Sequence, residues 1–490
     1  MNVQVPSFLD QARWNGKGLI DGWQSLSGGT HDIRNPATDD VIATVAMATP
    51  TDVGAAAGRA SAAQAEWAAL PAAQRGKILS KAADLLEEHG EELIAWIMRE
   101  SGSIQPKAAV EIEHSAGFIR HAAAMATEPN GHTIPSDDGR FSIARRVPHG
   151  VVGVISPFNF PLILSIRAVA PALAVGNAVV LKPDPRTPIS GGVTIARIFE
   201  EAGLPAGVLS VISGGADAGE AMCTDPNIAM VSFTGSAEIG AKVGELCGRH
   251  IKKVQLELGG KNALVVLDDA DLDTAVSNAA WGCYLHQGQI CMATGLVLVQ
   301  EAIAQTFVEK LAAKARQLPA GDPMSGQVAL GPIINDRQVD RIQRIVDESV
   351  AQGARLVTGG RHDGRFYAAT VLADVRPGMP AFDEEIFGPV AVVAAFATDE
   401  DAVDLANRSD YGLAAGVISS SLNRALAVGN RLNVGHLHIN DQTVMAGPFA
   451  PFGGCGKSGN GGRISGPANW EEFTQWQWVT VKDSAGLYPF

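Results

Sequence analysis

The 490-residue chain has few cysteines, few positive charges and no long apolar run. Its five cysteines show no C-x-x-C spacing, which predicts neither a disulfide framework nor a zinc site. They are Cys223, Cys247, Cys283, Cys291 and Cys455. Lys and Arg number 38 against 52 Asp and Glu, and the formal net charge of −14 leaves no basic surplus for a general nucleic-acid binder. An anionic ligand must therefore be bound by local positive groups and backbone amides.

Signals for membranes and export are also missing from the sequence. No apolar stretch is long enough to cross a bilayer, and residues 1–6 lack a basic segment followed by an apolar one. With 46% hydrophobic and 18% charged residues, the composition is typical of a globular protein with two or three domains. We expect a reduced, cytoplasmic protein that binds no metal, no membrane and no nucleic acid.

Periodicity predicts an α/β protein. Residues 51–70 and 72–98 have helical spacing of apolar side chains. From about residue 150, short β-rich runs alternate with helical ones, and one helix is expected to end at Gly203, before Pro205. This alternation predicts a parallel, doubly wound sheet. Its expected strands are 151–156, 178–182, 208–212 and 230–233.

A second alternating region follows Glu257 and predicts another α/β unit, which carries Cys291. Its expected strands are 263–267 and 391–396, and a helix is expected at 302–316. Residues 131–147 and 470–481 are rich in Thr, Trp, Phe and Val, which predicts extended strands. These two strands are expected either to pair with each other or to extend the sheet of a neighbouring subunit.

Cys291 and Glu257, 34 residues apart, are the residues that most clearly indicate chemistry. A thiolate can attack a carbonyl carbon, and a carboxylate can activate the water that later releases the product. Cys291 lies in a turn-like setting, and a helix N-terminus there would favour the thiolate. Glu257 ends an apolar strand and is followed by Gly259 and Gly260, which would let the carboxylate move. The alternatives are a buried structural cysteine and a solvated turn glutamate.

Asn159 follows an expected strand, in the run Ser156-Pro157-Phe158-Asn159-Phe160-Pro161. Its side-chain NH2 and the Cys291 backbone N–H can together hold the oxygen that becomes negative when the thiolate adds. Loss of one such donor typically costs about 2.7–4 kcal/mol of transition-state stabilisation. The alternative interpretation is an Asx turn before proline.

Three further segments suit a dinucleotide, although each alone fits ordinary turn chemistry. Thr234-Gly235-Ser236 follows a strand and opens a helix, so its amides can face a pyrophosphate. In Lys182-Pro183-Asp184, either the lysine or the aspartate can bind ribose hydroxyls. In Glu385-Ile386-Phe387, the glutamate can bind the second ribose and the phenylalanine can lie near the nicotinamide.

Taken together, the segments resemble the aldehyde dehydrogenase superfamily from end to end. They run in that family's order, from Asn35-Pro36-Ala37-Thr38 through Asn159, Lys182, Gly235-Ser236, Glu257, Cys291 and Glu385 to Pro451-Phe452-Gly453-Gly454. Within the superfamily, residues 285–293, 438–442 and 488–490 are most similar to bacterial benzaldehyde and vanillin dehydrogenases.

The resemblance implies a fold, an activity and an assembly. It implies a Rossmann-type dinucleotide domain (1–125 and 148–256), an α/β catalytic domain (257–440) and a small β oligomerisation domain (126–147 and 441–490). It implies NAD(P)-dependent oxidation of an aromatic aldehyde to the acid by a homodimer or homotetramer. Cys291 would be the nucleophile, Glu257 the general base and Asn159 the oxyanion donor.

The expected cofactor and substrate residues follow. The cofactor residues are Ser156, Pro157, Phe158, Lys182, Asp184, Gly215, Thr234, Gly235, Ser236, Ile239, Gly240, Leu258, Glu385 and Phe387. The substrate residues are Phe160, Leu164, Arg167, Ile290, Met292, Phe449 and Phe452. Apart from Arg167 they form an apolar, aromatic set that suits a flat ring. The alternative is that they only pack the core between domains.

Three positions depart from the commonest pattern of the family. The usual ribose-binding glutamate is replaced by Pro185; Asp184 beside it favours NAD, whereas Arg186 would tolerate NADP. Ala168 occupies a place that is often lysine. A second glutamate is usual near Ile464, so Glu257 has no obvious carboxylate relay.

Three rival functions remain from the sequence. One is an aliphatic or semialdehyde dehydrogenase, and another is a coenzyme A-acylating relative, which the Glu257-Leu258-Gly259-Gly260 segment disfavours. The third is a catalytically silent paralogue, which the presence of nucleophile, oxyanion donor and base disfavours.

Overall fold

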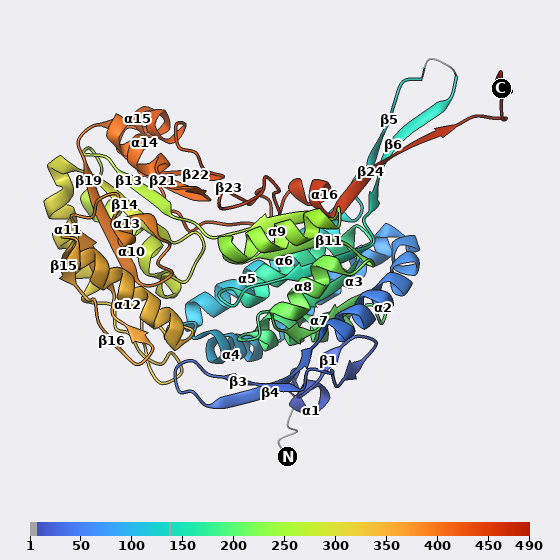
Figure 1. Ribbon diagram of the computed structural model, residues 1–490, viewed down its shortest axis with the longest axis horizontal. Coiled ribbons are helices and arrows are strands. Elements are labelled where there is room, and N and C mark those ends of the chain that lie inside the picture. Colours follow the sequence, from blue (N-terminus) through green and yellow to red (C-terminus); the bar gives the residue numbers. More distant parts are fainter. Residues whose placement is uncertain (1–6, 137–138) are drawn as a thin grey trace.

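The computed structural model describes residues 7–136 and 139–490. The expected absence of an export signal concerned residues 1–6, and these lie outside the described residues. Figure 1 shows two lobes, each built on a seven-stranded sheet, and a long arm that projects from one of them. No helix in the described ranges combines the length and the apolar character that a membrane span requires.

The first sheet is the expected doubly wound one. Its strand order is β12 (Lys253–Glu257), β11 (Ile228–Thr234), β7 (Val151–Ile155), β8 (Ala178–Lys182), β9 (Leu209–Val211), β1 (Gly18–Leu19) and β2 (Trp23–Gln24). The strands from β12 to β9 are parallel. The chain leaves β9 and returns to the other side of β7, so the order reverses between β7 and β11.

Both faces of this sheet are covered, which explains why its strands are continuously apolar. Val152 and Val154 of β7 pack into one core, whereas Val151 and Ile155 pack into the other, as alternation along a strand requires. The first core contains α3 (Ala72–Glu88), α4 (Gly90–Ser101), α5 (Gln105–Met125), α6 (Pro161–Ala174) and α7 (Thr194–Ala202). The second contains α2 (Pro50–Ala69), α8 (Ala216–Thr224) and α9 (Ala237–Arg249).

The second sheet lies in the other lobe (Figure 1). Its order is β15 (Arg355–Thr358), β18 (Thr370–Ala373), β19 (Val390–Phe396), β14 (Thr294–Gln300), β13 (Asn262–Val266), β21 (Ala414–Ile418) and β22 (His436–Ile439). Only the edge pair of β15 with β18 is antiparallel among these described strands. Its faces are covered by α10 (Leu272–Tyr284) and α11 (Glu301–Ala315) on one side and by α12 (Asp336–Ala351), α14 (Asp399–Asn407) and α15 (Leu422–Gly429) on the other.

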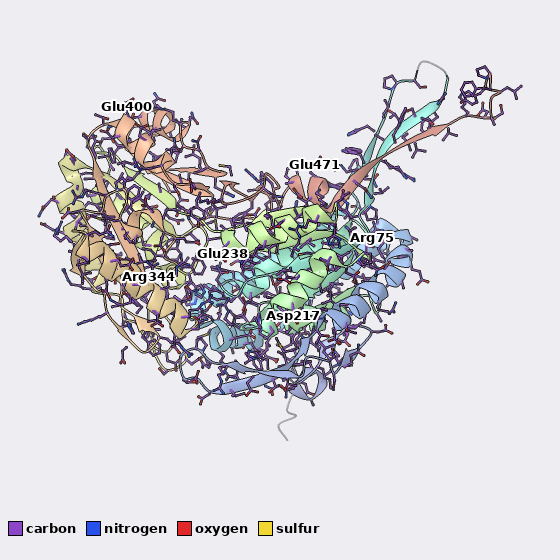
Figure 2. The ribbon with its side chains drawn as sticks, in the orientation of Figure 1. Arg75, Asp217, Glu238, Arg344, Glu400 and Glu471 are labelled. Atoms are coloured by element: carbon purple, nitrogen blue, oxygen red, sulfur yellow. The ribbon has the colours of Figure 1, made fainter. Side chains whose placement is uncertain are left out.

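The arm confirms that the two segments expected to be extended, within 131–147 and 470–481, pair with each other. β24 (Thr474–Val481) runs antiparallel to β6 (Phe141–Pro148) along its whole length, and β5 (Gly131–Thr133) pairs with the other edge of β6. The expected start of the last strand, at residue 470, is wrong. Residues 468–473 form helix α16 (Ala468–Phe473), because Phe473 is fully buried and Glu471, labelled at the base of the arm in Figure 2, pairs with Arg146. These contacts outweigh the β propensity of Trp and Phe.

Candidate active site

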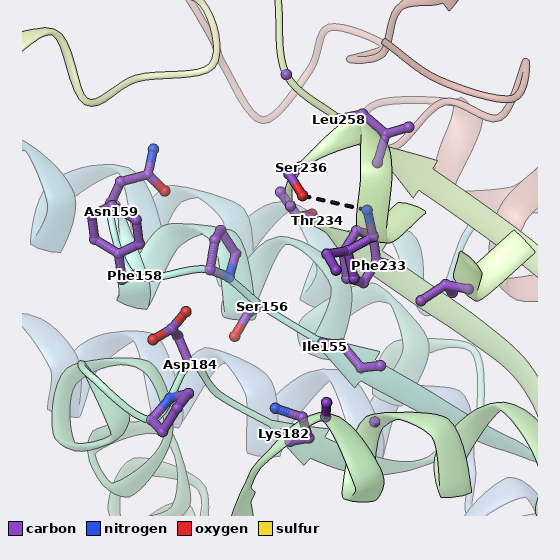
Figure 3. A pocket seen from close by; sticks show the side chains of 18 of the residues that line it. Ile155, Ser156, Phe158, Asn159, Lys182, Asp184, Phe233, Thr234, Ser236 and Leu258 are labelled. Atoms are coloured by element: carbon purple, nitrogen blue, oxygen red, sulfur yellow. Dashed lines mark hydrogen bonds between the residues drawn. The ribbon is translucent and has the colours of Figure 1, made fainter. Parts of the chain in front are cut away.

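A cavity of about 540 Å³ opens where the strand order reverses, at the carboxyl ends of β7 and β11. In open α/β sheets this position is where ligands bind. Figure 3 shows Asn159, Phe158 and Asp184 from one side of the cavity and Thr234, Ser236 and Leu258 from the other. Cys291, which the second lobe contributes, also lines it.

The structure brings most of the expected residues to this one cavity. Its walls include Ser156, Pro157, Phe158, Asn159, Leu164, Lys182, Asp184, Gly215, Thr234, Gly235, Ser236, Ile239, Leu258, Cys291, Glu385 and Phe387. Gly240 is not among them, and a Cβ at that position would clash with Leu258. Glu257 is also not among them, although its neighbours Leu258 and Gly259 are.

Two helix N-termini face the cavity. Gly215 precedes α8 and Ser236 caps α9, where its hydroxyl oxygen accepts a hydrogen bond from the Ile239 amide at 3.4 Å (Figure 3). Free amides and the positive end of the helix dipole make such termini suitable for anions. The expected placement of Thr234-Gly235-Ser236 between a strand and a helix is confirmed by β11 and α9.

Asp184 and Arg186 form a closed ion pair at the cavity wall. Arg186 donates Nε and Nη2 to the two carboxylate oxygens, at 2.8 and 2.7 Å, and its guanidinium lies 4.1 Å from the centre of the Phe158 ring. Burial alone would raise the pKa of Asp184, but the hydrogen bonds and charge of Arg186 hold it below its usual value. Nearby, Lys182 Nζ donates to the Gly214 carbonyl at 2.9 Å.

Glu385 and Phe387 reach the same cavity from the second lobe. The Glu385 carboxylate accepts a hydrogen bond from the Gly260 amide at 3.1 Å, and burial raises its pKa to about 7. Phe387 has a φ of 57° and meets the Phe158 ring edge-on, with 5.9 Å between ring centres. A positive φ in a bulky residue is strained, and such strain often accompanies a binding site.

Cys291 lies in a turn between the short helix η2 (Leu285–Gly288) and β14. The expected helix N-terminus at the thiol is wrong, because too few residues separate Cys291 from β14 for a helix to start. His286 and Gln287 have φ values of 47° and 56°, which ends helical geometry before the cysteine. Burial raises the pKa of the Cys291 thiol to about 12, and the positive charge of Arg167 acts against this rise.

Asn159 precedes α6 and is held at two points. Its Nδ2 donates to the Gln289 carbonyl at 2.9 Å, which ties the amide to the chain just before Cys291. Its backbone carbonyl accepts from Lys107 Nζ at 2.8 Å. The Lys107 ammonium is paired with Glu111 at 2.6 Å, and Glu111 in turn accepts from the Leu162 amide at 2.8 Å.

The Lys107–Glu111 pair was not found by the sequence reasoning. Both side chains are completely buried, and they lie on α5, about 50 residues before Asn159. The only sequence signal is the i,i+4 spacing, which usually marks a solvated helix face. In the structure this pair instead fixes the start of α6 and the carbonyl of Asn159.

Glu257 lies at the end of β12, with 2% of its surface exposed. Its Oε1 accepts a hydrogen bond from Gln255 Nε2 at 2.9 Å, and its Oε2 has no hydrogen-bond partner among the described residues. Burial raises the pKa of Glu257 to about 8, opposed by Arg167, Arg463 and Gln255 and reinforced by Glu472. Glu472 of α16 thus brings a second carboxylate close enough to affect this pKa, while its own oxygens bind the Arg463 amide at 3.1 Å and Lys253 at 3.4 Å.

Most of the expected substrate residues belong to the large apolar core of the first lobe, against which Cys291 packs. Leu164, Ile290, Met292 and Phe452 are buried in it, and Phe160 packs against it. Arg167 is 3% exposed, and its guanidinium lies 4.3 Å from the centre of the Phe452 ring. Its Nε and Nη2 have no hydrogen-bond partner among the described residues. Phe449 is 73% exposed and meets His121 edge-on, so it lies at the surface rather than in the core.

Comparison with known proteins agrees with this geometry. Residues 23–479 match the aldehyde dehydrogenase family. The chain belongs to that family. It is 51% identical to a vanillin dehydrogenase from Amycolatopsis sp., covering 99% of this chain and 100% of the relative. It is 49% identical to a benzaldehyde dehydrogenase [NAD(+)] from Pseudomonas putida, covering 98% and 99%. A crystal structure of a salicylaldehyde dehydrogenase from Pseudomonas putida G7 with salicylaldehyde superposes with a TM-score of 0.93 at 36% identity, covering 97% and 99%.

As a member of this family, the protein is an NAD(P)-dependent, aldehyde-oxidising enzyme. The cavity suits such a dinucleotide on its own chemistry. Two helix N-termini, at Gly215 and Ser236, can receive a pyrophosphate, and two carboxylates, Asp184 and Glu385, can accept ribose hydroxyls.

Proposed function

We propose that this aldehyde dehydrogenase oxidises aromatic aldehydes of the benzaldehyde type to carboxylic acids. The observation that carries the proposal is the apolar surrounding of Cys291: its neighbours Ile290 and Met292 and the ring of Phe452 are buried in the core of the first lobe, and Cys291 and Phe160 pack against that core. Ring-on-ring contacts contribute about 0.5–1.5 kcal/mol beyond the burial of area, so such a surrounding favours a flat ring over a short alkyl chain. The names of the two relatives at 51% and 49% identity agree with it.

In the proposed cycle, Cys291 forms the covalent bond to the substrate and Glu257 transfers the proton. The Cys291 thiolate attacks the aldehyde carbon, and the Asn159 NH2 with the Cys291 amide holds the oxygen as it becomes negative. Bound NAD(P) supplies the acceptor for the aldehyde hydride. Glu257 then takes a proton from water, which attacks the Cys291 thioester and releases the acid. The buried position of Glu257 and its raised pKa suit a group that takes up this proton near neutral pH.

NAD is proposed to be the preferred cofactor. Asp184 presents a carboxylate at the cavity wall, which repels a 2′-phosphate and accepts hydrogen bonds from ribose hydroxyls. The guanidinium of Arg186 is already engaged by both oxygens of Asp184, so its charge is not free for a phosphate. Lys182 and Lys242 also line the cavity, but Lys242 pairs with Glu238 at 3.0 Å.

The remaining expectations are also part of the proposal. The two seven-stranded sheets and the three-stranded sheet of the arm support a division into dinucleotide, catalytic and oligomerisation domains. The arm carries the exposed Trp476 and Trp478, which suit contact with another subunit in a homodimer or homotetramer. All five cysteines are free thiols, which fits a reducing cytoplasm. An acylating relative that uses coenzyme A is the second candidate, and the presence of Glu257 disfavours it.

A panel of aldehydes tests the proposal. The kcat/KM for benzaldehyde and its ring-substituted relatives is expected to exceed that for acetaldehyde and propanal well beyond experimental error, with NAD as cofactor. Equal values for benzaldehyde and propanal would contradict the aromatic assignment. Single-turnover formation of free acid without added thiol separates hydrolysis from transfer to coenzyme A.

A further inference from the structure

Gln255 occupies an unusual place for a polar side chain. It is on β12, two residues before Glu257, so both side chains point to the same face of the sheet. It is completely buried, as are Ser232 at 3% exposure and Glu257 at 2%. A buried amide of this kind is stable only when its hydrogen bonds are made, and here they are made to specific groups.

The amide is fixed at both ends. Ser232 on β11 lies opposite Gln255 in the strand register, and its hydroxyl donates to Gln255 Oε1 at 2.7 Å. At the other end Gln255 Nε2 donates to Glu257 Oε1 at 2.9 Å. The reverse orientation would place the amide oxygen against a carboxylate oxygen, two acceptors in contact. The Glu257 carboxylate therefore selects the orientation of the amide, and the Ser232 hydroxyl, which can donate or accept, binds the oxygen at the other end.

The glycine-rich loop that follows Phe452 closes over these side chains. A Cβ at Gly453 would come 2.8 Å from Glu257 Oε1, and one at Gly462 would come 3.2 Å from Gln255 Cγ. Asn460 anchors the loop to β12 by accepting from the Leu256 amide at 3.1 Å and donating to the Val254 carbonyl at 2.8 Å. The loop therefore leaves little room for the Gln255–Glu257 hydrogen bond to rearrange.

We propose that Gln255 is a positioning residue for thioester hydrolysis. It holds Oε1 of Glu257 and thereby leaves Oε2, which has no partner among the described residues, as the oxygen that takes the proton from water. The inference rests on the proposed role of Glu257 as general base. No bond to substrate is implied for Gln255 itself.

The charged and titratable groups around Glu257 determine the balance between its charged and neutral forms, on which the hydrogen bond from Gln255 also acts. Arg167 of α6 and Arg463 of the glycine-rich loop favour the carboxylate, whereas Glu472 of α16 and burial disfavour it, and the Cys291 thiol also interacts with it. The Gln255 N–H favours the charged form, because a carboxylate accepts a stronger hydrogen bond than a neutral acid. Removal of this donor should therefore raise the pKa of Glu257 and delay its deprotonation to higher pH.

The test is the pH dependence of acyl-enzyme hydrolysis in Gln255→Met, which keeps the length and volume of the side chain but removes the amide. Acyl-enzyme formed from radiolabelled benzaldehyde and NAD is acid-quenched over time, and the NADH burst is recorded in parallel. We expect hydrolysis at pH 7 to fall about threefold to tenfold and to recover at high pH, with the burst amplitude unchanged. Ser232→Ala, which lets the amide rotate, is expected to shift the profile less and in the same direction.

Several outcomes overturn the inference. A uniform loss of hydrolysis at every pH in Gln255→Met would indicate a structural role, and loss of the burst would place Gln255 before the thioester. If Gln255→Met does not fold, Gln255→Leu, which also removes the amide donor, carries the test, and an unchanged profile in that variant contradicts the inference. Glu257→Gln separates a failure of the proposed general base from a failure of the role of Gln255. Full hydrolysis in Glu257→Gln would mean that Glu257 is not the general base. Slow hydrolysis in Glu257→Gln together with an unshifted pH profile in Gln255→Met would contradict only the role of Gln255.

Discussion

Arg186 binds the carboxylate of Asp184 through two parallel hydrogen bonds of 2.8 and 2.7 Å and at the same time lies against the ring of Phe158. The pair joins a cation and an anion that the sequence places two residues apart and that would otherwise favour different cofactors. Because both oxygens of Asp184 bind the guanidinium, the charge of Arg186 is not free for a 2′-phosphate. The proposed preference for NAD would therefore depend on whether this pair stays closed.

Asp184→Asn should raise the preference for NADP. The change removes the negative charge and one bidentate partner, which frees Arg186 for the 2′-phosphate. We expect the ratio of kcat/KM for NADP to that for NAD to rise about tenfold or more, which corresponds to about 1.4 kcal/mol. The control is Arg186→Gln, which leaves the charge of Asp184 and should lower the ratio or leave it unchanged. An unchanged ratio in Asp184→Asn would show that neither residue selects the cofactor.

Cys291→Ala should abolish aldehyde oxidation and leave binding of NADH nearly intact. In the proposed cycle the thiol forms the covalent intermediate, and its loss removes no charged contact from the cavity wall. Steady-state NADH formation and quenching of tryptophan fluorescence by NADH measure the two properties. Cys455→Ala is the matched control, since its thiol contacts the Asn433 carbonyl at 3.2 Å, and we expect it to keep full activity. Substantial activity in Cys291→Ala would mean that another group attacks the aldehyde.

Glu257→Gln should separate hydride transfer from hydrolysis. We expect a burst of about one NADH per active site followed by a slow steady rate. In the wild-type enzyme burial raises the pKa of Glu257 to about 8, and a base acts only when it is deprotonated. Hydrolysis should therefore increase as the pH rises through about 8 and level off above it. Loss of this dependence in Glu257→Gln, measured by acyl-enzyme decay, checks the assignment; a missing burst would place Glu257 in an earlier step.

The parts of the site that are continuous in sequence could be predicted. Strands β7, β8 and β11 are short apolar runs with a turn signal after each. Asn159 follows β7, whereas Lys182 and Thr234 are the last residues of β8 and β11. The position of α6 and the reversal of strand order bring these turns together at one edge of the sheet. Local pattern and topology rules were sufficient for this part.

Contacts between distant segments could not be predicted. The pair formed by Lys107 and Glu111 meets Asn159, and Glu472 approaches Glu257 from α16, more than 200 residues away. No periodicity relates such positions. The predicted environment of Cys291 was wrong for a local reason: His286 and Gln287 already take positive φ values before Gly288, and neither residue type signals this in the sequence.

The buried pair on α5 provides a prediction about stability. Lys107→Met leaves the Glu111 carboxylate buried without its cation, which is expected to lower the free energy of unfolding by about 3–5 kcal/mol. The double variant Lys107→Met with Glu111→Gln should lose clearly less, because the glutamine oxygen can still accept from the Leu162 amide. Urea unfolding at fixed protein concentration measures both. Equal losses in the single and double variants would mean that the charge of Glu111 is not the cause.

Arg167 and Arg463 should have separable effects, because the two cations reach different groups. Arg167 acts on both Cys291 and Glu257, whereas Arg463 acts on Glu257. Arg167→Met should raise the pKa of the thiol further and slow alkylation of Cys291 by iodoacetamide several-fold between pH 8 and 9, a window that lies below the thiol pKa of about 12. Arg463→Met should leave alkylation unchanged, while both variants slow acyl-enzyme hydrolysis at pH 7, because each removes a charge that favours the Glu257 carboxylate. Mass spectrometry of the peptide that contains Cys291 gives the alkylation rate without interference from the other thiols.

Equal alkylation rates in the two variants would mean that Arg167 does not stabilise the Cys291 thiolate and that its contact with the Phe452 ring is its main interaction.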